Sequence, residues 1–265
     1  MKSTITIERL RVMKREGEKI ASLTAYDAGF ARILNQAGVE MLLVGDSLGM
    51  VLHGEQNTLR VTVDEMVYHT RQVARGSGSS FVLADMPFMS YATPGQAMAN
   101  AGRLVGEGGA HMVKLEGAAW LCDTVEQLST RGIPVCAHLG LTPQWVNKFS
   151  GYRVQGRTPE AARVILADAR SLESAGAEML VLESVPAALA QQITGAVTMP
   201  VIGIGAGLDC DGQVLVLHDL LGITEHAPRA SRNFMEGVGD IRSAVQAYVR
   251  AVKERTFPGP ENSFT

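Results

Sequence analysis

Short apolar runs that end in a polar side chain recur along the chain. Residues 42–44 are leucine, leucine and valine, and Gly45 and Asp46 follow them. Runs with apolar residues on both faces suit parallel strands that are covered on both sides. We expect strands at residues 20–27, 41–46, 81–85, 111–116, 134–138, 179–183, 200–205 and 214–218.

Helix signals occupy most of the intervals between these strands. Thr62 with Glu65 predicts a capping box, and Thr93 before Pro94 marks another helix start. The charged residues 5–16 predict a short helix outside the core, and residues 241–254 predict a final helix. Alternating strands and helices predict a (β/α)8 TIM barrel with an N-terminal helix and a C-terminal helical extension, as a single domain over residues 1–265.

The eighth strand is the least certain element of this pattern. Only about seven residues separate residue 214 from Gly207, whereas a parallel crossover usually needs about a dozen or more. Either a single helical turn bridges the two strands, or the eighth strand lies elsewhere.

Composition and charge narrow the class of protein. The net charge is −3 with both signs interspersed, which gives no electrostatic footprint for nucleic acid or for an anionic membrane. No apolar stretch reaches the roughly 18 residues that a membrane span needs, and the charged N-terminus leaves no room for a signal peptide. We therefore expect a cytoplasmic protein. Cys122, Cys136 and Cys210 form neither a metal-ligand pair nor a disulfide framework.

Carboxylates end the second, third and fourth expected strands. Asp46 and Asp85 should be neighbours, and two adjacent carboxylates repel unless a cation lies between them. Mg²⁺ suits one or two carboxylates together with water and substrate oxygens. Glu116 could join such a site directly or through water. The alternative is that each carboxylate caps a helix or forms an ion pair on the barrel rim.

Three further side chains could complete a site at these strand ends. Lys114 points to the same side of its strand as Glu116, where it could neutralise the carboxylates, bind an anion or, less favourably, form a Schiff base. His138 could hydrogen-bond substrate, act as an acid or be satisfied by a backbone group. Glu183 lies further around the ring, where it could act as a general base or remain a structural rim carboxylate.

Seven ordered motifs of the chain resemble those of one enzyme family. They are LTAYD (23–27), VGDSLGM (44–50), ADMPFMSY (84–91), VKLEG (113–117), HLGLTPQ (138–144), GYRVQG (151–156) and IGIGAG (202–207). On these motifs the chain resembles ketopantoate hydroxymethyltransferase, also called 3-methyl-2-oxobutanoate hydroxymethyltransferase, from about residue 3 to residue 264.

The resemblance implies a fold, a reaction and an assembly. The fold is a (β/α)8 barrel. The reaction transfers a hydroxymethyl group from 5,10-methylenetetrahydrofolate to 3-methyl-2-oxobutanoate through an enolate stabilised by Mg²⁺, and it gives 2-dehydropantoate for pantothenate and coenzyme A biosynthesis. The partners are thus a small 2-oxo acid and a folate, and the assembly is a homodecamer of two pentameric rings.

The resemblance also implies roles for single residues. Asp46 and Asp85 match the family's Mg²⁺ ligands, and Glu116 completes that site. Ser47 and Lys114 match substrate-binding residues. His138 is expected to contact the substrate together with Asp46 and Asp85, and Glu183 matches the general base.

Two other functions remain open on the sequence. The first is a Mg²⁺-dependent lyase or mutase that acts on another 2-oxo acid, in the manner of phosphoenolpyruvate mutase and isocitrate lyase, without folate. The second is a barrel retained as a binding or regulatory subunit. The presence of Asp46, Asp85, Lys114 and Glu183 argues against that second function, because a non-catalytic barrel needs none of them.

Overall fold

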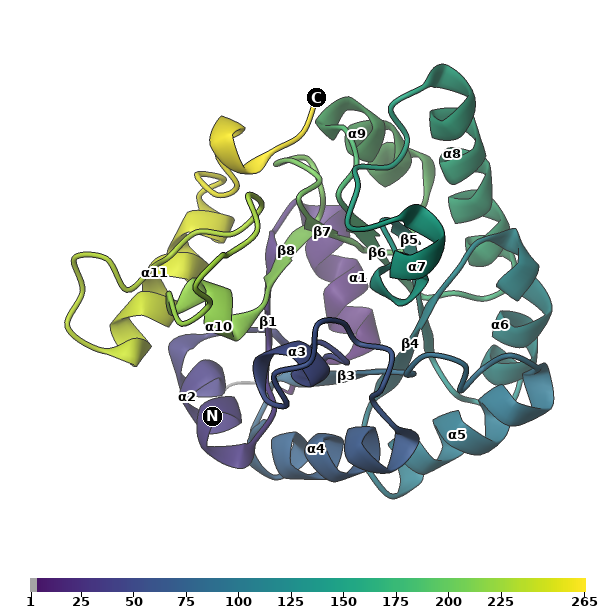
Figure 1. The fold of residues 1–265 in the computed structure, drawn as a ribbon, viewed down its shortest axis with the longest axis horizontal. Helices are drawn as coiled ribbons and strands as arrows, with labels where there is room; N and C mark the ends of the chain where they lie inside the picture. The colour runs from purple at the N-terminus through teal and green to yellow at the C-terminus, as the bar shows by residue number, and fades with distance from the viewer. Residues whose placement is uncertain (1–3) are drawn as a thin grey trace.

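Eight parallel strands form one closed barrel in the computed structural model, which describes residues 4–265 (Figure 1). Each strand pairs with the next along the chain, and β8 pairs with β1. The strands are β1 (Ile20–Thr24), β2 (Met41–Val44), β3 (Phe81–Asp85), β4 (Met112–Glu116), β5 (Val135–Gly140), β6 (Met179–Glu183), β7 (Val201–Ile204) and β8 (Gly212–Leu215). The predicted TIM barrel is confirmed.

Helices surround the barrel and lie over both of its ends (Figure 1). They are α1 (Ile7–Glu16), α2 (Ala28–Ala37), α3 (Leu48–Val51), α4 (Val63–Gly76), α5 (Pro94–Gly106), α6 (Cys122–Ser129), α7 (Val146–Phe149), α8 (Pro159–Ser174), α9 (Ala187–Ala196), α10 (Leu217–Leu220) and α11 (Ile241–Lys253). Single 3-10 turns form η1 (Ala119–Leu121), η2 (Pro143–Trp145) and η3 (Pro260–Asn262). None of the helices within residues 4–265 is both long enough and apolar enough to cross a membrane.

The predicted helix starts are confirmed by their cap geometry. The Thr62 hydroxyl accepts from the backbone N–H of Glu65, whose carboxylate accepts from the backbone N–H of Thr62, so both halves of the capping box are present. Thr93 caps α5 in the same way, with Pro94 in the first turn. These caps fix where α4 and α5 begin, and therefore the length of the loops that precede them.

The N-terminal helix is part of the core, which corrects the expectation that it lies outside. Leu10 and Met13 of α1 are 0% and 1% exposed. They pack with residues inside the barrel, including Phe81 and Met112. Burying two such side chains contributes about 1.5–3 kcal/mol each. The many charged residues of α1 hid this packing in the sequence.

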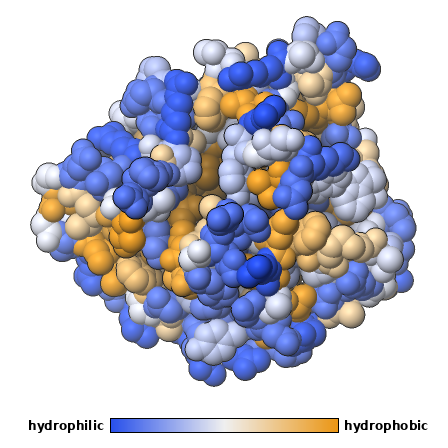
Figure 2. Space-filling model, viewed as in Figure 1, coloured by the Kyte–Doolittle hydropathy of each residue, from blue (hydrophilic) through white to orange (hydrophobic). Residues whose placement is uncertain are grey.

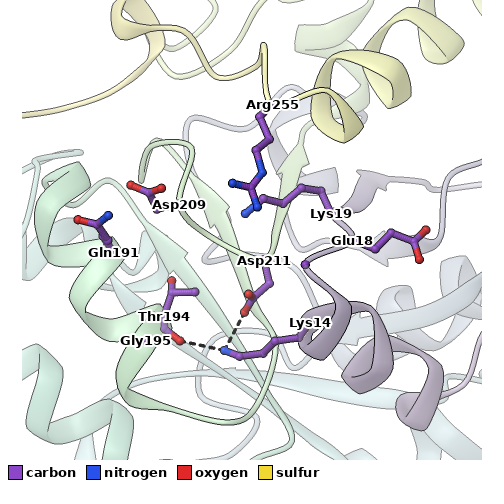
Figure 3. Close-up of a pocket in the computed structure, with 10 residues that line it drawn as sticks. Lys14, Glu18, Lys19, Gln191, Thr194, Gly195, Asp209, Asp211 and Arg255 are labelled. Atoms are coloured by element: carbon purple, nitrogen blue, oxygen red, sulfur yellow. Dashed lines mark hydrogen bonds and ion pairs between the residues drawn. The ribbon is translucent and has the colours of Figure 1, made fainter.

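Lys14 also links α1 to the barrel. It lies beside a cavity of about 300 Å³ at the amino ends of the strands (Figure 3). Its Nζ atom donates to the carbonyl oxygens of Thr194 and Met199 at 3.0 and 2.9 Å and lies 2.8 Å from Asp211 Oδ2. Asp211 in turn accepts from the backbone N–H of Val201. Partly buried polar contacts of Lys14 and Asp211 therefore join α1 to the amino end of the barrel.

The eighth strand starts two residues earlier than expected, at Gly212 instead of residue 214. Residues 205–211 connect β7 to β8 without a helix, so neither a full crossover nor the proposed helical turn is present. β8 pairs with β7 at two positions, Ile202 with Gly212 and Gly203 with Gln213. The second alternative, a misplaced strand, is therefore confirmed, and Leu217 and His218 of the expected strand begin α10 instead.

The carboxyl ends of the strands face the viewer in Figure 1, where α3 and α7 lie in front of the barrel and α1 behind it. Figure 2 shows this face hollowed near its centre, with hydrophobic residues visible in the hollow and hydrophilic residues around its edge. The polar side chains singled out in the sequence come from this end of the strands.

Candidate active site at the carboxyl ends of the strands

Asp46 and Asp85 lie side by side at the ends of β2 and β3. Their exposed fractions are 4% and 3%. The backbone N–H of Asp46 donates to Asp85 Oδ2 at 3.0 Å. Gly45 leaves room for the Ser47 hydroxyl, because a Cβ atom at Gly45 would lie 2.6 Å from Ser47 Oγ. The predicted neighbourhood of the two aspartates is confirmed.

Lys114 supplies the positive charge of this cluster. Its Nζ atom lies 3.1 Å from Asp85 Oδ1 and 3.5 Å from Glu116 Oε1. Burial alone would lower the pKa of Lys114, but the carboxylates of Asp85, Glu116 and Asp46 outweigh burial and raise it. A raised pKa keeps the amine protonated, so the geometry favours electrostatic binding over a Schiff base.

The cluster carries more negative than positive charge. Three buried carboxylates, those of Asp46, Asp85 and Glu116, share one ammonium group. Burial and the neighbouring charges of Asp85 and Glu116 raise the pKa of Asp46 well above its usual range. Burial likewise raises the pKa of Asp85, although Lys114 opposes the shift. A cation bound between the two aspartates would remove this repulsion.

Glu116 is held by protein groups on both of its oxygens. Oε2 accepts from the backbone N–H of Gln144 at 3.0 Å, and Oε1 lies 3.5 Å from both Lys114 Nζ and His138 Nδ1. Within residues 4–265, no three His, Cys, Asp or Glu side chains converge as ligands of one metal ion. The aspartate pair could hold a cation, and two carboxylates would fit Mg²⁺ completed by water and substrate oxygens.

His138 connects Lys114 to Glu183. Lys114 Nζ lies 3.0 Å from His138 Nδ1. Because the ammonium group can only donate, this contact requires the imidazole proton on Nε2. That atom lies 3.3 Å from Glu183 Oε2 and makes no hydrogen bond with any residue of the described chain. His138 is therefore not satisfied by a backbone group, and its Nε2–H faces the Glu183 carboxylate.

Ser47 and Tyr26 form a second polar pair near Asp46. Ser47 Oγ lies 3.0 Å from the Tyr26 hydroxyl. Tyr26 is buried, and burial raises the pKa of its hydroxyl, which keeps it protonated. Ser47 also precedes α3 as its N-terminal cap residue.

Gln144 and Tyr91 belong to the site although the sequence reasoning gave them no role. Gln144 Nε2 donates to Asp46 Oδ2 at 2.8 Å and to the carbonyl oxygen of Met86 at 2.9 Å. The Tyr91 hydroxyl bonds Gln144 Oε1. Both residues stand inside motifs that carried the family resemblance, and Gln144 lies in the long segment after β5. The motifs could have indicated both residues, and the long segment could have indicated Gln144.

The segment after β5 reaches across the barrel mouth. The Tyr152 hydroxyl lies 3.7 Å from Met50 Sδ on α3. Burial raises the pKa of Tyr152, and the charges of Glu183, Asp46 and Glu116 raise it further. Tyr152 is nevertheless about half exposed, so it lies between the carboxylates and solvent.

Solved structures with a similar fold include phosphonopyruvate hydrolase in complex with oxalate and Mg²⁺. That chain is 12% identical, with a TM-score of 0.63 over 83% of each chain. Another is 2,3-dimethylmalate lyase, a member of the PEP mutase/isocitrate lyase superfamily, which is 17% identical with a TM-score of 0.58, over 82% of this chain and 81% of that one. At these identities the likeness concerns the fold alone.

Relatives in sequence are far more similar. The 3-methyl-2-oxobutanoate hydroxymethyltransferase of Nitrosococcus oceani is 61% identical over 261 residues, which cover 98% of this chain and 99% of the relative. The enzyme of the same name from Marinobacter nauticus is 57% identical and covers 98% of both chains. The family model described as ketopantoate hydroxymethyltransferase matches residues 4–260. With this match over nearly its whole length, the chain belongs to the ketopantoate hydroxymethyltransferase family of transferases.

Proposed function

We propose that this enzyme transfers a hydroxymethyl group from 5,10-methylenetetrahydrofolate to 3-methyl-2-oxobutanoate and releases 2-dehydropantoate. The observation that carries the proposal is the buried pair of Asp46 and Asp85 beside Lys114. A 2-oxo acid offers a carboxylate and a keto oxygen, and such a cluster can bind both through a divalent cation and an ammonium group. Family membership points to the same substrates.

Asp46 and Asp85 would hold Mg²⁺. Bound there, the ion would withdraw charge from the keto group of the substrate and make its C3 proton more acidic. Glu116 has both oxygens near protein donors, so we propose that it acts through water and by holding Lys114 in place.

Lys114, Ser47 and His138 would orient the substrate. The Lys114 ammonium group is kept charged by its carboxylate neighbours and can pair with the substrate carboxylate. Ser47 Oγ and the unpartnered His138 Nε2–H can each contact a substrate oxygen. These contacts would fix which face of C3 is presented to the base.

Glu183 would remove the C3 proton. Its carboxylate lies at the end of β6, on the far side of His138 from the aspartate pair, and its side chain is 18% exposed. A carboxylate outside the metal site can accept a proton while the enolate forms. The enolate carbon would then attack the methylene carbon of the folate, and water would replace the folate nitrogen.

We also propose that the chain forms one domain, functions in the cytoplasm and assembles as a homodecamer. The first proposal is supported by the closed barrel and by the packing of α1 and α11 against it, and the others by family membership. Multi-angle light scattering tests the assembly, since a mass of about ten chains is expected and a monomeric mass would contradict it.

Deuterium exchange at C3 of 3-methyl-2-oxobutanoate tests the first half of the reaction. The exchange is followed by NMR with and without Mg²⁺ and without folate. We expect Mg²⁺-dependent exchange. If exchange occurs neither alone nor with tetrahydrofolate present, the substrate assignment is wrong. Folate-independent C–C cleavage of another 2-oxo acid would favour the lyase alternative.

A further inference from the structure

Gln144 forms hydrogen bonds with several groups of the carboxylate cluster. It lies on η2, directly after β5 and its loop, and is 3% exposed. Its backbone N–H donates to Glu116 Oε2 at 3.0 Å, and its side-chain amide donates to Asp46 Oδ2 at 2.8 Å. One residue therefore contacts two of the three carboxylates and carries no charge itself.

The surroundings favour one orientation of the Gln144 amide. Nε2 faces two acceptors, an oxygen of the ionised Asp46 carboxylate and the carbonyl oxygen of Met86. Oε1 faces the Tyr91 hydroxyl, which can donate to it or to the carbonyl oxygen of Glu116. If the amide were turned over, its oxygen would face two acceptors in a buried site, at a cost of about 1–3 kcal/mol for each unpaired group.

These bonds leave one oxygen of Asp46 for a ligand. Gln144 occupies Asp46 Oδ2, and the backbone N–H of Asp46 occupies Asp85 Oδ2. Asp85 Oδ1 is paired with Lys114 Nζ at 3.1 Å, whereas no hydrogen bond to Asp46 Oδ1 is found within residues 4–265. Asp46 Oδ1 is therefore the oxygen of that carboxylate that remains for a cation.

We propose that Gln144 is a positioning residue that selects which oxygen of Asp46 binds the metal ion. The proposal rests on the Mg²⁺ site proposed above. Without the amide, the Asp46 carboxylate is free to turn about its last bond, and Lys114 attracts it electrostatically. Tyr91 acts one step further away, by holding the amide through Oε1.

The first test measures metal affinity without substrate or turnover. Binding of Mn²⁺, as a probe for Mg²⁺, is followed by the EPR signal of the free ion. We expect Gln144→Met to weaken binding about 10- to 100-fold, the range found for residues that support metal ligands. The matched control is Gln127→Met, because Gln127 also donates its amide to an aspartate, Asp123 at 3.0 Å, on the outer surface of α6. We expect no change in that variant.

The second test is a crystal structure of metal-free Gln144→Met. We expect the Asp46 carboxylate to have turned from its wild-type orientation. Tyr91→Phe, which keeps Gln144, is measured in both tests in case Gln144→Met does not fold. For Tyr91→Phe we expect a smaller loss of Mn²⁺ affinity and a disordered Gln144 amide.

The outcomes distinguish the proposed metal site from the proposed positioning role of Gln144. Wild-type affinity in Gln144→Met, or an unturned Asp46 carboxylate in its metal-free crystal, would overturn the positioning role. If the wild-type protein itself binds no Mn²⁺, the proposed metal site fails, and the crystal structure alone decides whether Gln144 positions Asp46. Equal losses in Gln144→Met and Gln127→Met would also count against a role specific to Gln144.

Discussion

Asp85 and Lys114 are direct partners in the register of β3 and β4, and Lys114 Nζ lies 3.1 Å from Asp85 Oδ1. The strand pairing itself therefore brings a fixed positive charge to a candidate metal ligand. No loop needs to move to form this ion pair, so the polarity of the site is set when the sheet forms.

Replacing Lys114 by methionine should destabilise the protein. The variant leaves Asp85 and Glu116 buried without their ammonium partner, which costs about 3–5 kcal/mol. Urea unfolding in EDTA measures the loss. Mg²⁺ should restore part of the stability, because the ion supplies positive charge to the same carboxylates. An unchanged unfolding midpoint would show that the pair does not contribute.

Replacing Glu183 by glutamine should stop proton removal and leave metal binding intact. We expect C3 exchange to fall about 10²- to 10⁴-fold, the usual contribution of a general base, with Mn²⁺ affinity unchanged. Glu178→Gln is the matched control, since Glu178 precedes β6 and pairs with Arg11 on the opposite end of the barrel. Near-normal exchange in Glu183→Gln would show that another group is the base.

Mg²⁺ should raise the thermal stability more at pH 8 than at pH 5. Burial and the charges of Asp85 and Glu116 raise the pKa of Asp46 in the folded state. A raised pKa favours the folded state at low pH, and this contribution is lost as the pH rises through the folded-state pKa. A metal ion competes with the proton on Asp46. It also compensates the repulsion between the carboxylates that appears when this proton is lost. Melting curves with Mg²⁺ or EDTA at both pH values test this, and Asp46→Asn should abolish the difference. An equal increase in Tm at the two pH values would contradict the argument.

A methyl group at Gly140 should disturb the site, whereas one at Gly132 should not. Both glycines have a positive φ, +89° and +82°, so alanine costs about 1–2 kcal/mol of backbone strain at each. At Gly140 the new Cβ would also lie 2.2 Å from the carbonyl oxygen of Glu183, whereas at Gly132 nothing lies within 4 Å. We expect Gly140→Ala to lose about 1–3 kcal/mol more than Gly132→Ala. Urea unfolding and C3 exchange are measured for both variants. Equal effects would show that the end of β6 shifts to accommodate the added methyl group.

Much of the fold was predictable because apolar runs and capping residues are local signals. The capping box at Thr62 and the strands 81–85 and 179–183 needed no tertiary information. The eighth strand was misplaced because its pairing with β1, from Ile20 with Gly212 onward, joins residues that are distant in sequence. The burial of Leu10 and Met13 was missed for a similar reason, since what they pack against lies far along the chain.

The residues of the candidate site fall into two similar groups, those marked by a local pattern and those recognised only from tertiary contacts. Asp46, Asp85, Glu116 and His138 were found because each lies at or just beyond the end of an apolar run. Gln144 and Tyr91 lie in irregular segments, and their importance depends on hydrogen bonds to other strands. Hydrogen-bond partners across the barrel cannot be deduced from residue type, so no pattern in the sequence assigns a function to an uncharged amide.

The pairing of β8 with β1 has a consequence for how the protein is made. Ile20 can pair only after Gly212 has been synthesised, so the barrel cannot close on the ribosome until about four fifths of the polypeptide has been made. Contacts between such distant segments slow folding, and nascent chains that expose unpaired strand edges are prone to aggregate. The growing chain therefore depends on its local β-α-β units, and on any chaperone that covers β1, until translation has passed β8.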